Sequence, residues 1–260
     1  MNDDLPLARR DQIAERLAQG QPVVAAALAV EFDVSEDAIR RDLRALAAEG
    51  RCRRVYGGAL PITPASAPMA ARMDAASERK SALARAAVSL IDRGEFVFLD
   101  SGSTNLALVD VLPEEFELTV ATNSIDIAAA VLRRPDLQLV MIGGGVDPVV
   151  GGSVDANAVQ SVTQLSIDRC FIGSCAVSPK DGISAFGLAD ATFKRALLAA
   201  SAHSVALVTT DKFDTRAPYR VAAIKAIDHV VVEHDVPRAQ HTVLSKAGTA
   251  VLRAEPPAAQ

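Results

Sequence analysis

Residues 32–58 read FDVSEDAIRRDLRALAAEGRCRRVYGG, and this stretch decides the fold of the N-terminal part of the chain. Ser35 is suited to cap a helix, because its hydroxyl can accept a hydrogen bond from a free backbone N–H of the first turn. Behind it, until Gly50 closes the pattern, apolar residues recur at helical spacing, at Ala38, Ile39, Leu43, Leu46 and Ala47. Short strands are expected over 51–56, and Gly57–Gly58 is typical of a turn.

Two further helices are predicted upstream of this stretch. The first covers Leu7–Gln19 and stops at Gly20, and the second begins at Pro22 and runs to Glu31. Residues 32–34 then form a tight turn. Three short helices with a turn before the last one, followed by short strands, are the pattern of a winged helix-turn-helix head.

Charge is unevenly distributed along the chain. The net charge of −5 and the pI near 5.4 argue against general binding of polyanions, but from Arg40 to Gly58 six arginines face only two acidic residues. Such a run usually solvates a surface helix. Its coincidence with the helix-turn-helix pattern favours DNA instead, because arginine pairs with guanine or phosphate. The predicted DNA-binding residues are Ser35, Glu36, Asp37, Arg40, Arg41 and Arg44 in the recognition helix and Arg51, Arg53 and Arg54 in the wing.

The length of 260 residues suits a small head and a larger body. We expect the head over 1–59 and a linker over 60–76, where three prolines favour an extended and mobile connection. The body is expected over 77–255, with a frayed tail over 256–260.

The body has the pattern of an α/β fold. Apolar runs of strand length occur at 96–99, 118–121, 137–142, 170–172, 205–208 and 229–232. Helical patterns occur at 77–91, 106–112, 125–133, 154–165 and 190–202. This alternation, with strands that are apolar on both faces, predicts a mostly parallel sheet covered by helices.

Small and hydroxyl-bearing residues follow several of these strands. The first case is Asp100–Asn105, DSGSTN, which follows a strand and opens a helix, so its backbone N–H groups and hydroxyls could hold an anion. It is not a Walker loop, and such loops often serve only as turns and caps. Residues 122–124 and 143–145 hold comparable positions after strands, and residues 151–153, before the next helix, are a further candidate. Because the carboxyl ends of parallel strands share one edge, we expect these loops to converge there.

The head motif and the body loops together resemble the DeoR family of sugar-metabolism repressors. In the head the resemblance rests on Phe32–Ser35, on Ile39–Leu43 with the later Leu46 and Gly50, and on Tyr56–Ala59. In the body it rests on Asp100–Thr104, Thr122–Ser124, Gly143–Gly144, Phe171–Gly173 and Lys212–Phe213. It implies a body similar in fold to ribose-5-phosphate isomerase and CoA transferases that senses a phosphorylated sugar. No cofactor is implied. Two departures bear on operator and ligand preference, namely Ala38 where threonine is usual and Thr209 where aspartate is usual.

The loops, two candidate cations and the resemblance together give one set of predicted effector-binding residues. It comprises Asp100, Ser101, Gly102, Ser103, Thr104, Thr122, Asn123, Ser124, Gly143, Gly144, Gly152, Lys194, Asp211 and Lys212. Asp211 enters as a possible substitute for the carboxylate missing at Thr209.

The rival functions are a sugar-phosphate isomerase and a plain interaction module. Carboxylates that could act as a general base are present at Asp100, Asp181, Asp190 and Asp211. An isomerase has no use for a fused DNA-binding head, so we expect a regulator and no enzyme. Its expected partners are double-stranded operator DNA and further copies of itself, as a homodimer or homotetramer.

Two further observations concern location and metals. The first ten residues do not resemble a signal peptide and no apolar run reaches about 18 residues, so the expected location is the cytoplasm. The three cysteines and four histidines show no metal-binding spacing and are expected to be structural, at Cys52, Cys170, Cys175, His203, His229, His234 and His241.

Overall fold

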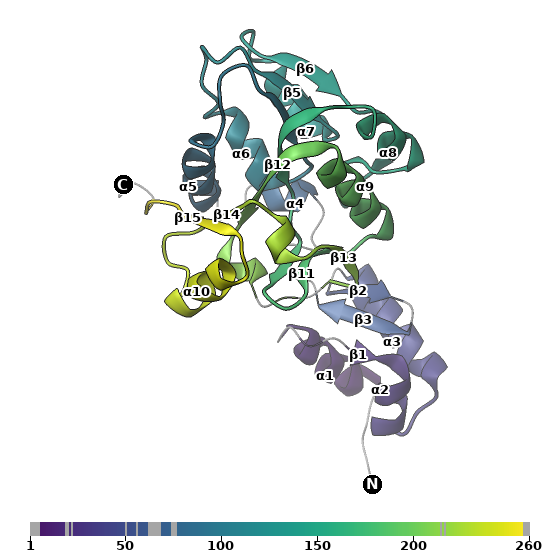
Figure 1. Ribbon diagram of the computed structural model, residues 1–260. Coiled ribbons are helices and arrows are strands. Elements are labelled where there is room, and N and C mark those ends of the chain that lie inside the picture. The colour runs from purple at the N-terminus through teal and green to yellow at the C-terminus, as the bar shows by residue number, and fades with distance from the viewer. Residues whose placement is uncertain are drawn as a thin grey trace. The chain divides into compact units, whose positions relative to one another are not determined.

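The structure is a computed structural model that describes residues 6–18, 21, 23–49, 51–55, 57–61, 69–73, 77–213, 215 and 217–256. Its contacts divide the chain into two units, Met1–Ala67 and Pro68–Gln260 (Figure 1). Several predicted features lie outside the described residues, namely the breaks at Gly20, Pro22 and Gly50, the strand end at Tyr56, and residues 257–260 of the tail.

The first unit, called the head, contains three helices and a small sheet. The helices are α1 (Pro6–Ala18), α2 (Ala25–Glu31) and α3 (Glu36–Ala48). The strands β1 (Val23–Val24), β2 (Cys52–Val55) and β3 (Gly58–Pro61) pair antiparallel in the order β1-β3-β2. Ile13 and Leu17 of α1 meet Ile39 and Leu43 of α3 in one apolar core. This core fixes α3 against its scaffold and leaves the opposite face of the helix in solvent.

Two predictions for the head need correction. Residues 23–24 were expected to be helical, but this pair of β-branched residues forms a strand that lies against Gly58–Ala59. Gly58 was expected in a turn. It belongs to β3 instead, and a glycine is needed there because the backbone of Val23 passes so close that a side chain at this position would collide with it.

The second unit, called the body, is built on a seven-stranded sheet in which every neighbouring pair of strands is parallel. The order is β15-β14-β12-β9-β4-β5-β6. The strands are β4 (Phe96–Leu99), β5 (Thr119–Thr122), β6 (Gln138–Met141), β9 (Ile167–Ile172), β12 (Ser201–Val208), β14 (His229–Val232) and β15 (Ala250–Arg253). The predicted parallel α/β fold is thus confirmed, and β15 is the strand that the sequence reading missed.

Helices cover both faces of the sheet. Figure 1 shows α5 and α6 on one side of it and α8 and α9 on the other. The helices are α5 (Ser77–Val88), α6 (Ser103–Val109), α7 (Ile125–Val131), α8 (Ala156–Val162), α9 (Leu188–Ala199) and α10 (Arg238–Lys246). Within β4, Val97 and Leu99 pack with α5 and α6, whereas Phe98 packs with α8 and α9. Burial on both faces explains why the sheet strands read as continuous apolar runs.

Smaller elements complete the body. A hairpin of β7 (Val146–Asp147) and β8 (Gly152–Ser153) follows β6. A second sheet in the order β10-β11-β13 contains β10 (Ala176–Ser178), β11 (Gly182–Ala185) and β13 (Tyr219–Ala222). Two 3-10 turns, η2 (Thr210–Lys212) and η3 (Ile224–Ala226), flank β13. None of the described helices is long and apolar enough to cross a membrane.

The expected linker over 60–76 includes two described segments that belong to folded elements, while residues 62–68 and 74–76 lie outside the described residues. Leu60 and Pro61 belong to β3, where they pair with Arg53 and Cys52. Pro61 is tolerated there because β1 does not reach it, so no second strand needs its missing N–H. At the other end, α4 (Met69–Met73) is helical and Met69 is buried, so this part of the predicted linker packs in the body.

Candidate functional site

In the head, the face of α3 opposite the core is rich in arginine. Ser35 caps this helix, since its hydroxyl accepts the Ala38 N–H at 3.3 Å, as the sequence predicted. Arg40 is engaged by its own helix, 2.7 Å from Glu36 and 3.3 Å from Asp37. Glu36 and Asp37 therefore restrain Arg40 rather than stand free on the surface.

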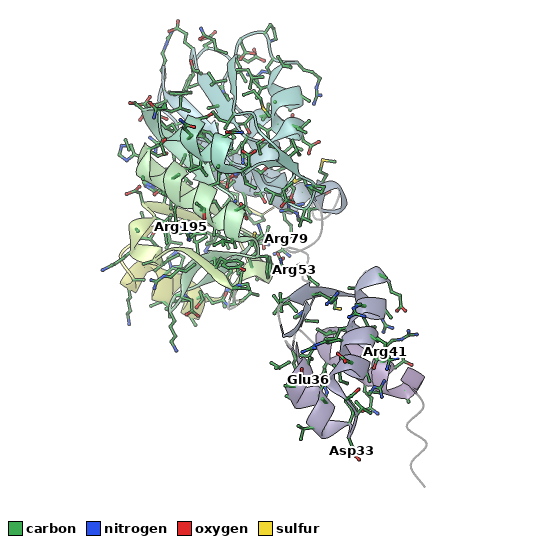
Figure 2. All side chains as sticks on the ribbon, turned by 90° about the vertical axis from the view of Figure 1, so that its right-hand side faces the viewer. Asp33, Glu36, Arg41, Arg53, Arg79 and Arg195 are labelled. Atoms are coloured by element: carbon green, nitrogen blue, oxygen red, sulfur yellow. The ribbon has the colours of Figure 1, made fainter. Side chains whose placement is uncertain are left out.

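Arg41, labelled in Figure 2, and Arg44 are exposed on α3, and neither forms an ion pair with any described residue. Their guanidinium groups are therefore free to pair with DNA. In and near the wing, Arg54 is exposed, Arg53 is half-buried, and Arg51 lies 3.8 Å from both Asp11 and Glu49. A hollow of about 380 Å³ lies between α3 and the wing, and Arg40 and Arg54 both line it.

In the body, the loops after β4 and β5 join at the carboxyl edge of the sheet. The Ser101 N–H donates to Asn123 Oδ1 at 3.0 Å, and Asn123 Nδ2 donates to the Ser153 carbonyl at 3.1 Å. The Ser153 N–H returns a bond to the Asn123 carbonyl at 2.9 Å. Thr122 steadies the same corner, because its hydroxyl donates to Leu99 O and accepts from Ser124 N–H. These bonds, with the β-bridge between Ser124 and Gly152, bring the loops at Ser101, at Thr122–Ser124 and at Gly152 together, as the strand-end argument predicted.

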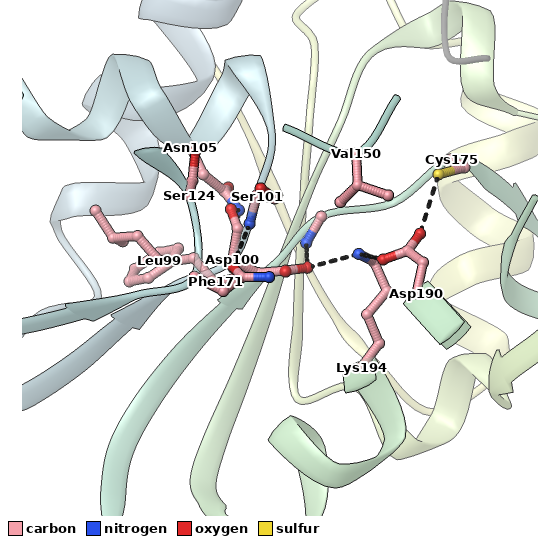
Figure 3. A network of polar contacts seen from close by, with 12 residues as sticks. Leu99, Asp100, Ser101, Asn105, Ser124, Val150, Phe171, Cys175, Asp190 and Lys194 are labelled. Carbon is pink, nitrogen blue, oxygen red and sulfur yellow. Dashed lines mark hydrogen bonds and ion pairs between the residues drawn. The ribbon is translucent and has the colours of Figure 1, made fainter. Parts of the chain in front are cut away.

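An ion network is buried next to these loops (Figure 3). Lys194 of α9 contacts two carboxylates, Asp100 Oδ2 at 2.9 Å and Asp190 one helical turn earlier. Asp100 Oδ2 also accepts the Gly173 N–H at 2.8 Å, which ties β9 to β4. Burial alone would lower the pKa of Lys194. The two carboxylates raise it by more than burial lowers it, so the pKa is raised overall and the ammonium stays charged. Burial, and then the Asp190 charge, raise the pKa of Asp100 against the opposing effect of Lys194.

Several polar atoms at this edge are buried without any hydrogen-bond partner among the described residues. They are Asp100 Oδ1, Ser101 Oγ, Ser124 Oγ and Ser174 Oγ. They follow β4, β5 and β9, which are neighbours in the sheet. Buried polar groups are nearly always paired, so such a cluster marks a place where a polar ligand or water completes the bonding.

Other predicted effector residues lie less centrally. Gly143 and Gly144 belong to an exposed loop, which Asp155 holds by accepting the Gly145 N–H at 2.8 Å. Asp211 is exposed, whereas Lys212 is half-buried and burial lowers its pKa. Gly102, Ser103 and Thr104 lie where the loop enters α6.

One detail of the predicted anion loop changes. Its backbone N–H groups were expected to bind the ligand, but the Ser101 N–H is already bonded to Asn123. Within this loop the Ser101 N–H is therefore not available to a ligand, whereas the unpaired Ser101 hydroxyl is.

The sequence reading missed several residues of this edge as ligand-site residues. Asp190 was considered only as a catalytic base, although it lies four residues before Lys194 and the two share a helix face. Ser174 directly follows a predicted strand end and carried the same signal as Ser101. Cys175, 4.0 Å from Asp190, and Arg72 gave no signal, because only the folded chain brings them to the edge.

Comparison with known proteins identifies both units. A model of the DeoR-like helix-turn-helix domain matches residues 9–65, and a model of the DeoR C-terminal sensor domain matches residues 75–234. The chain belongs to the DeoR family. The resemblance read from Ile39–Leu43 and from the strand-end loops is therefore confirmed.

Relatives of this DeoR-family chain are named as regulators. The glycerol-3-phosphate regulon repressor of Escherichia coli strain K12 is 27% identical over 91% of this chain and 94% of its own length. The HTH-type transcriptional regulator YgbI of the same strain is 30% identical, over 96% of this chain and 99% of its own length. The L-fucose operon activator, also of that strain, is 29% identical over 86% and 93%. The expectation of a transcriptional regulator and not an enzyme is confirmed by these names.

Solved structures resemble the DeoR-family body more distantly. Ribose 5-phosphate isomerase A from Methanocaldococcus jannaschii is 18% identical, covers 52% of this chain and 54% of its own, and gives a TM-score of 0.39. A likeness at this level carries no argument about the site. Among the described residues, no group of three or more His, Cys, Asp or Glu side chains is arranged to hold a metal ion.

Proposed function

We propose that this regulator binds operator DNA through α3 and the wing, and that a phosphorylated sugar bound at the carboxyl edge of β4, β5 and β9 controls this binding. The observation that supports the proposal is the cluster of unpaired buried atoms at that edge. Its three serine hydroxyls can donate to phosphate oxygens, and Asp100 Oδ1 can accept a sugar hydroxyl. The sensor domain of the DeoR family and the name of the glycerol-3-phosphate regulon repressor agree with this chemistry.

The proposed control is a two-state equilibrium in which the sugar phosphate favours the state that binds DNA poorly, so the effector relieves repression. A ligand can shift such an equilibrium only by its difference in affinity for the two states. We further propose that the chain acts in the cytoplasm as a homodimer or homotetramer, because helix-turn-helix proteins usually read repeated half-sites.

A thermal-shift screen tests the ligand class. The panel contains glycerol 3-phosphate, ribose 5-phosphate, glucose 6-phosphate and fructose 1-phosphate, each beside its unphosphorylated form and inorganic phosphate. A ligand at 100 times its Kd adds about 2.7 kcal/mol to stability, which raises Tm by about 5–10 °C for a protein of this size. We expect a phosphorylated compound to do so and its free sugar to fail.

Two variants assign that shift to the edge. Ser124→Ala removes one unpaired buried hydroxyl and should reduce the shift, whereas Ser161→Ala, on the exposed face of α8, should leave it unchanged. Equal shifts from a sugar and its phosphate, or a shift that Ser124→Ala does not alter, would contradict the proposed site.

A further inference from the structure

The hairpin β7–β8 lies between the candidate site and α4. On the site side, Gly152 leaves no room for a side chain, because a Cβ there would collide with Ser101 Oγ and would lie 2.6 Å from the Asn123 carbonyl oxygen. Ser124 and Gly152 also form a β-bridge. The hairpin is thus packed directly against the two loops that carry the unpaired hydroxyls.

The next residue of the same hairpin packs against α4. At Gly151 a Cβ would lie only 2.6 Å from the Met69 Cβ, so the buried Met69 side chain sits on this glycine. Gly151 and Gly152 are adjacent in the chain and meet α4 and the site loops respectively. If the site loops move, they displace Gly152, and Gly152 is bonded directly to Gly151, which contacts Met69.

Arg72 makes a second connection between α4 and the hairpin. Its guanidinium donates to the Val149 carbonyl at 3.2 Å and to the Val150 carbonyl at 3.4 Å. These carbonyls are held in a fixed turn, since Asp147 Oδ1 accepts the N–H groups of both residues. Val150, labelled in Figure 3, is half-buried in this turn. Arg72 therefore binds a turn whose backbone is already fixed by Asp147.

The main chain of Arg72 is anchored as well. The buried Lys80 of α5 donates to the Arg72 carbonyl, and α4 also lies against α6, which begins in the predicted anion loop. Burial lowers the pKa of Lys212, and the positive charge of Arg72 adds to this effect; burial raises the pKa of Cys175, and the same charge opposes that rise. Arg72 therefore belongs to the electrostatic surroundings of the same sheet edge.

Only residues 62–68 separate α4 from Pro61, where the head sheet ends. We propose that the hairpin β7–β8 and α4, joined through Met69 and Arg72, transmit the state of the candidate site to the segment that leads to the head. Arg72 is here a positioning residue and not an effector ligand. This inference rests on the proposed function for its purpose, but the contacts that carry it are independent of the ligand.

Limited trypsin digestion of the full chain tests the coupling without a ligand. Trypsin cuts after Arg72, and it can do so only when the guanidinium leaves the hairpin and the helix opens, so the rate of this cut reports how often α4 is released. Gly152→Ala pushes the hairpin from the site side and should accelerate the cut about tenfold, a factor comparable to losing one hydrogen bond to a charged group. The matched control Gly187→Ala adds a Cβ at an ordinary 3.6 Å from Asp190 and should change nothing.

Mass spectrometry of the same digest also measures the rate of cleavage after the exposed Arg93. This rate is the control for a general loss of structure in the body. If Gly152→Ala accelerates this cut as well, Ser101→Thr decides, because the Ser101 side chain lies against Gly152 and the threonine enlarges that side chain. The deciding variant is the one that is cleaved after Arg93 at the wild-type rate. If that variant is also cleaved after Arg72 at the wild-type rate, the proposed coupling is wrong. A sugar-phosphate screen without a hit would instead defeat the proposed function and leave this result standing.

Discussion

Replacing Lys194 by methionine removes the only cation that the described residues place against Asp100 and Asp190. Lys194 and Asp100 are 2% and 0% exposed, so water cannot screen the carboxylates that remain. Breaking a buried ion pair by removing one partner costs about 3–5 kcal/mol. Each kcal/mol lowers Tm by about 2–4 °C in a protein of this size, so we expect the body to melt about 6–20 °C lower at pH 7.

The same variant should be sensitive to pH, and the sign follows from the carboxylates. Without the ammonium, burial raises the pKa of Asp100 further above its unfolded value, because the main opposing effect is gone. A carboxyl whose folded pKa is raised gains stability as pH falls, since the folded state takes up its proton first. The deficit of Lys194→Met relative to the wild type should therefore shrink between pH 7 and pH 5.

Calorimetry of four proteins measures this prediction: the wild type, Lys194→Met, Asp190→Asn and the double variant. Asp190→Asn alone leaves the Lys194–Asp100 pair in place and should be mild. Added to Lys194→Met, it removes one of the two unpaired charges and should restore about 1–3 kcal/mol. A wild-type Tm for Lys194→Met, or a deficit that is equal at pH 5 and pH 7, would refute the reasoning.

Three further predictions concern the head, the predicted anion loop and a helix cap. Arg41→Ala should weaken DNA binding about tenfold in a mobility-shift assay. Arg40→Ala should weaken it less, because Arg40 is already held by Glu36 and Asp37. If Arg41→Ala binds DNA as well as Arg85→Ala, a control at an exposed arginine of the body, this prediction is contradicted. Gly102→Val should fold, since the backbone is extended and an added Cβ has only ordinary contacts at 3.9 Å. It should abolish the thermal shift caused by a sugar phosphate, while DNA binding persists. A normal thermal shift would show that the ligand binds elsewhere. Asp155→Ala should lower Tm at neutral pH, because hydrogen bonds from the Ala158 and Gly145 N–H groups lower the pKa of this carboxyl. The difference should hold down to about pH 4 and shrink as pH falls further, through the lowered pKa at which the folded wild type takes up the proton; a difference that does not shrink there would refute the assigned cause.

The elements that the sequence predicted well carry strong local signals. Residues 96–99 and 229–232 were placed to the residue, because strands buried on both faces are uninterrupted apolar runs. Helix α10 was missed since its sequence RAQHTVLSK is mostly polar and shows no long apolar stripe. The strands β7 and β8 have two residues each, too short to show any alternation.

Part of the candidate site could likewise be predicted from the sequence, and part of it could not. Strand-end loops could be predicted to converge, because a parallel sheet places all its carboxyl ends on one edge. The partners of Lys194 could be read only in part. Asp190 shares its helix, whereas Asp100 follows β4, far away in the sequence. That Ser101 N–H is used within the site while its hydroxyl stays unpaired depends on the Asn123 rotamer, which no sequence pattern reveals.

The central claim is that a sugar phosphate at the carboxyl edge of β4, β5 and β9 controls DNA binding by the head. Fluorescence anisotropy of a labelled operator fragment, selected in vitro with the full chain, tests it most directly. Titration with a phosphorylated compound that passes the thermal-shift screen should raise the apparent Kd for DNA at least tenfold in the wild type, a change of about 1.4 kcal/mol, and leave Gly102→Val unaffected. An unchanged affinity for DNA with the compound at saturation would contradict the account.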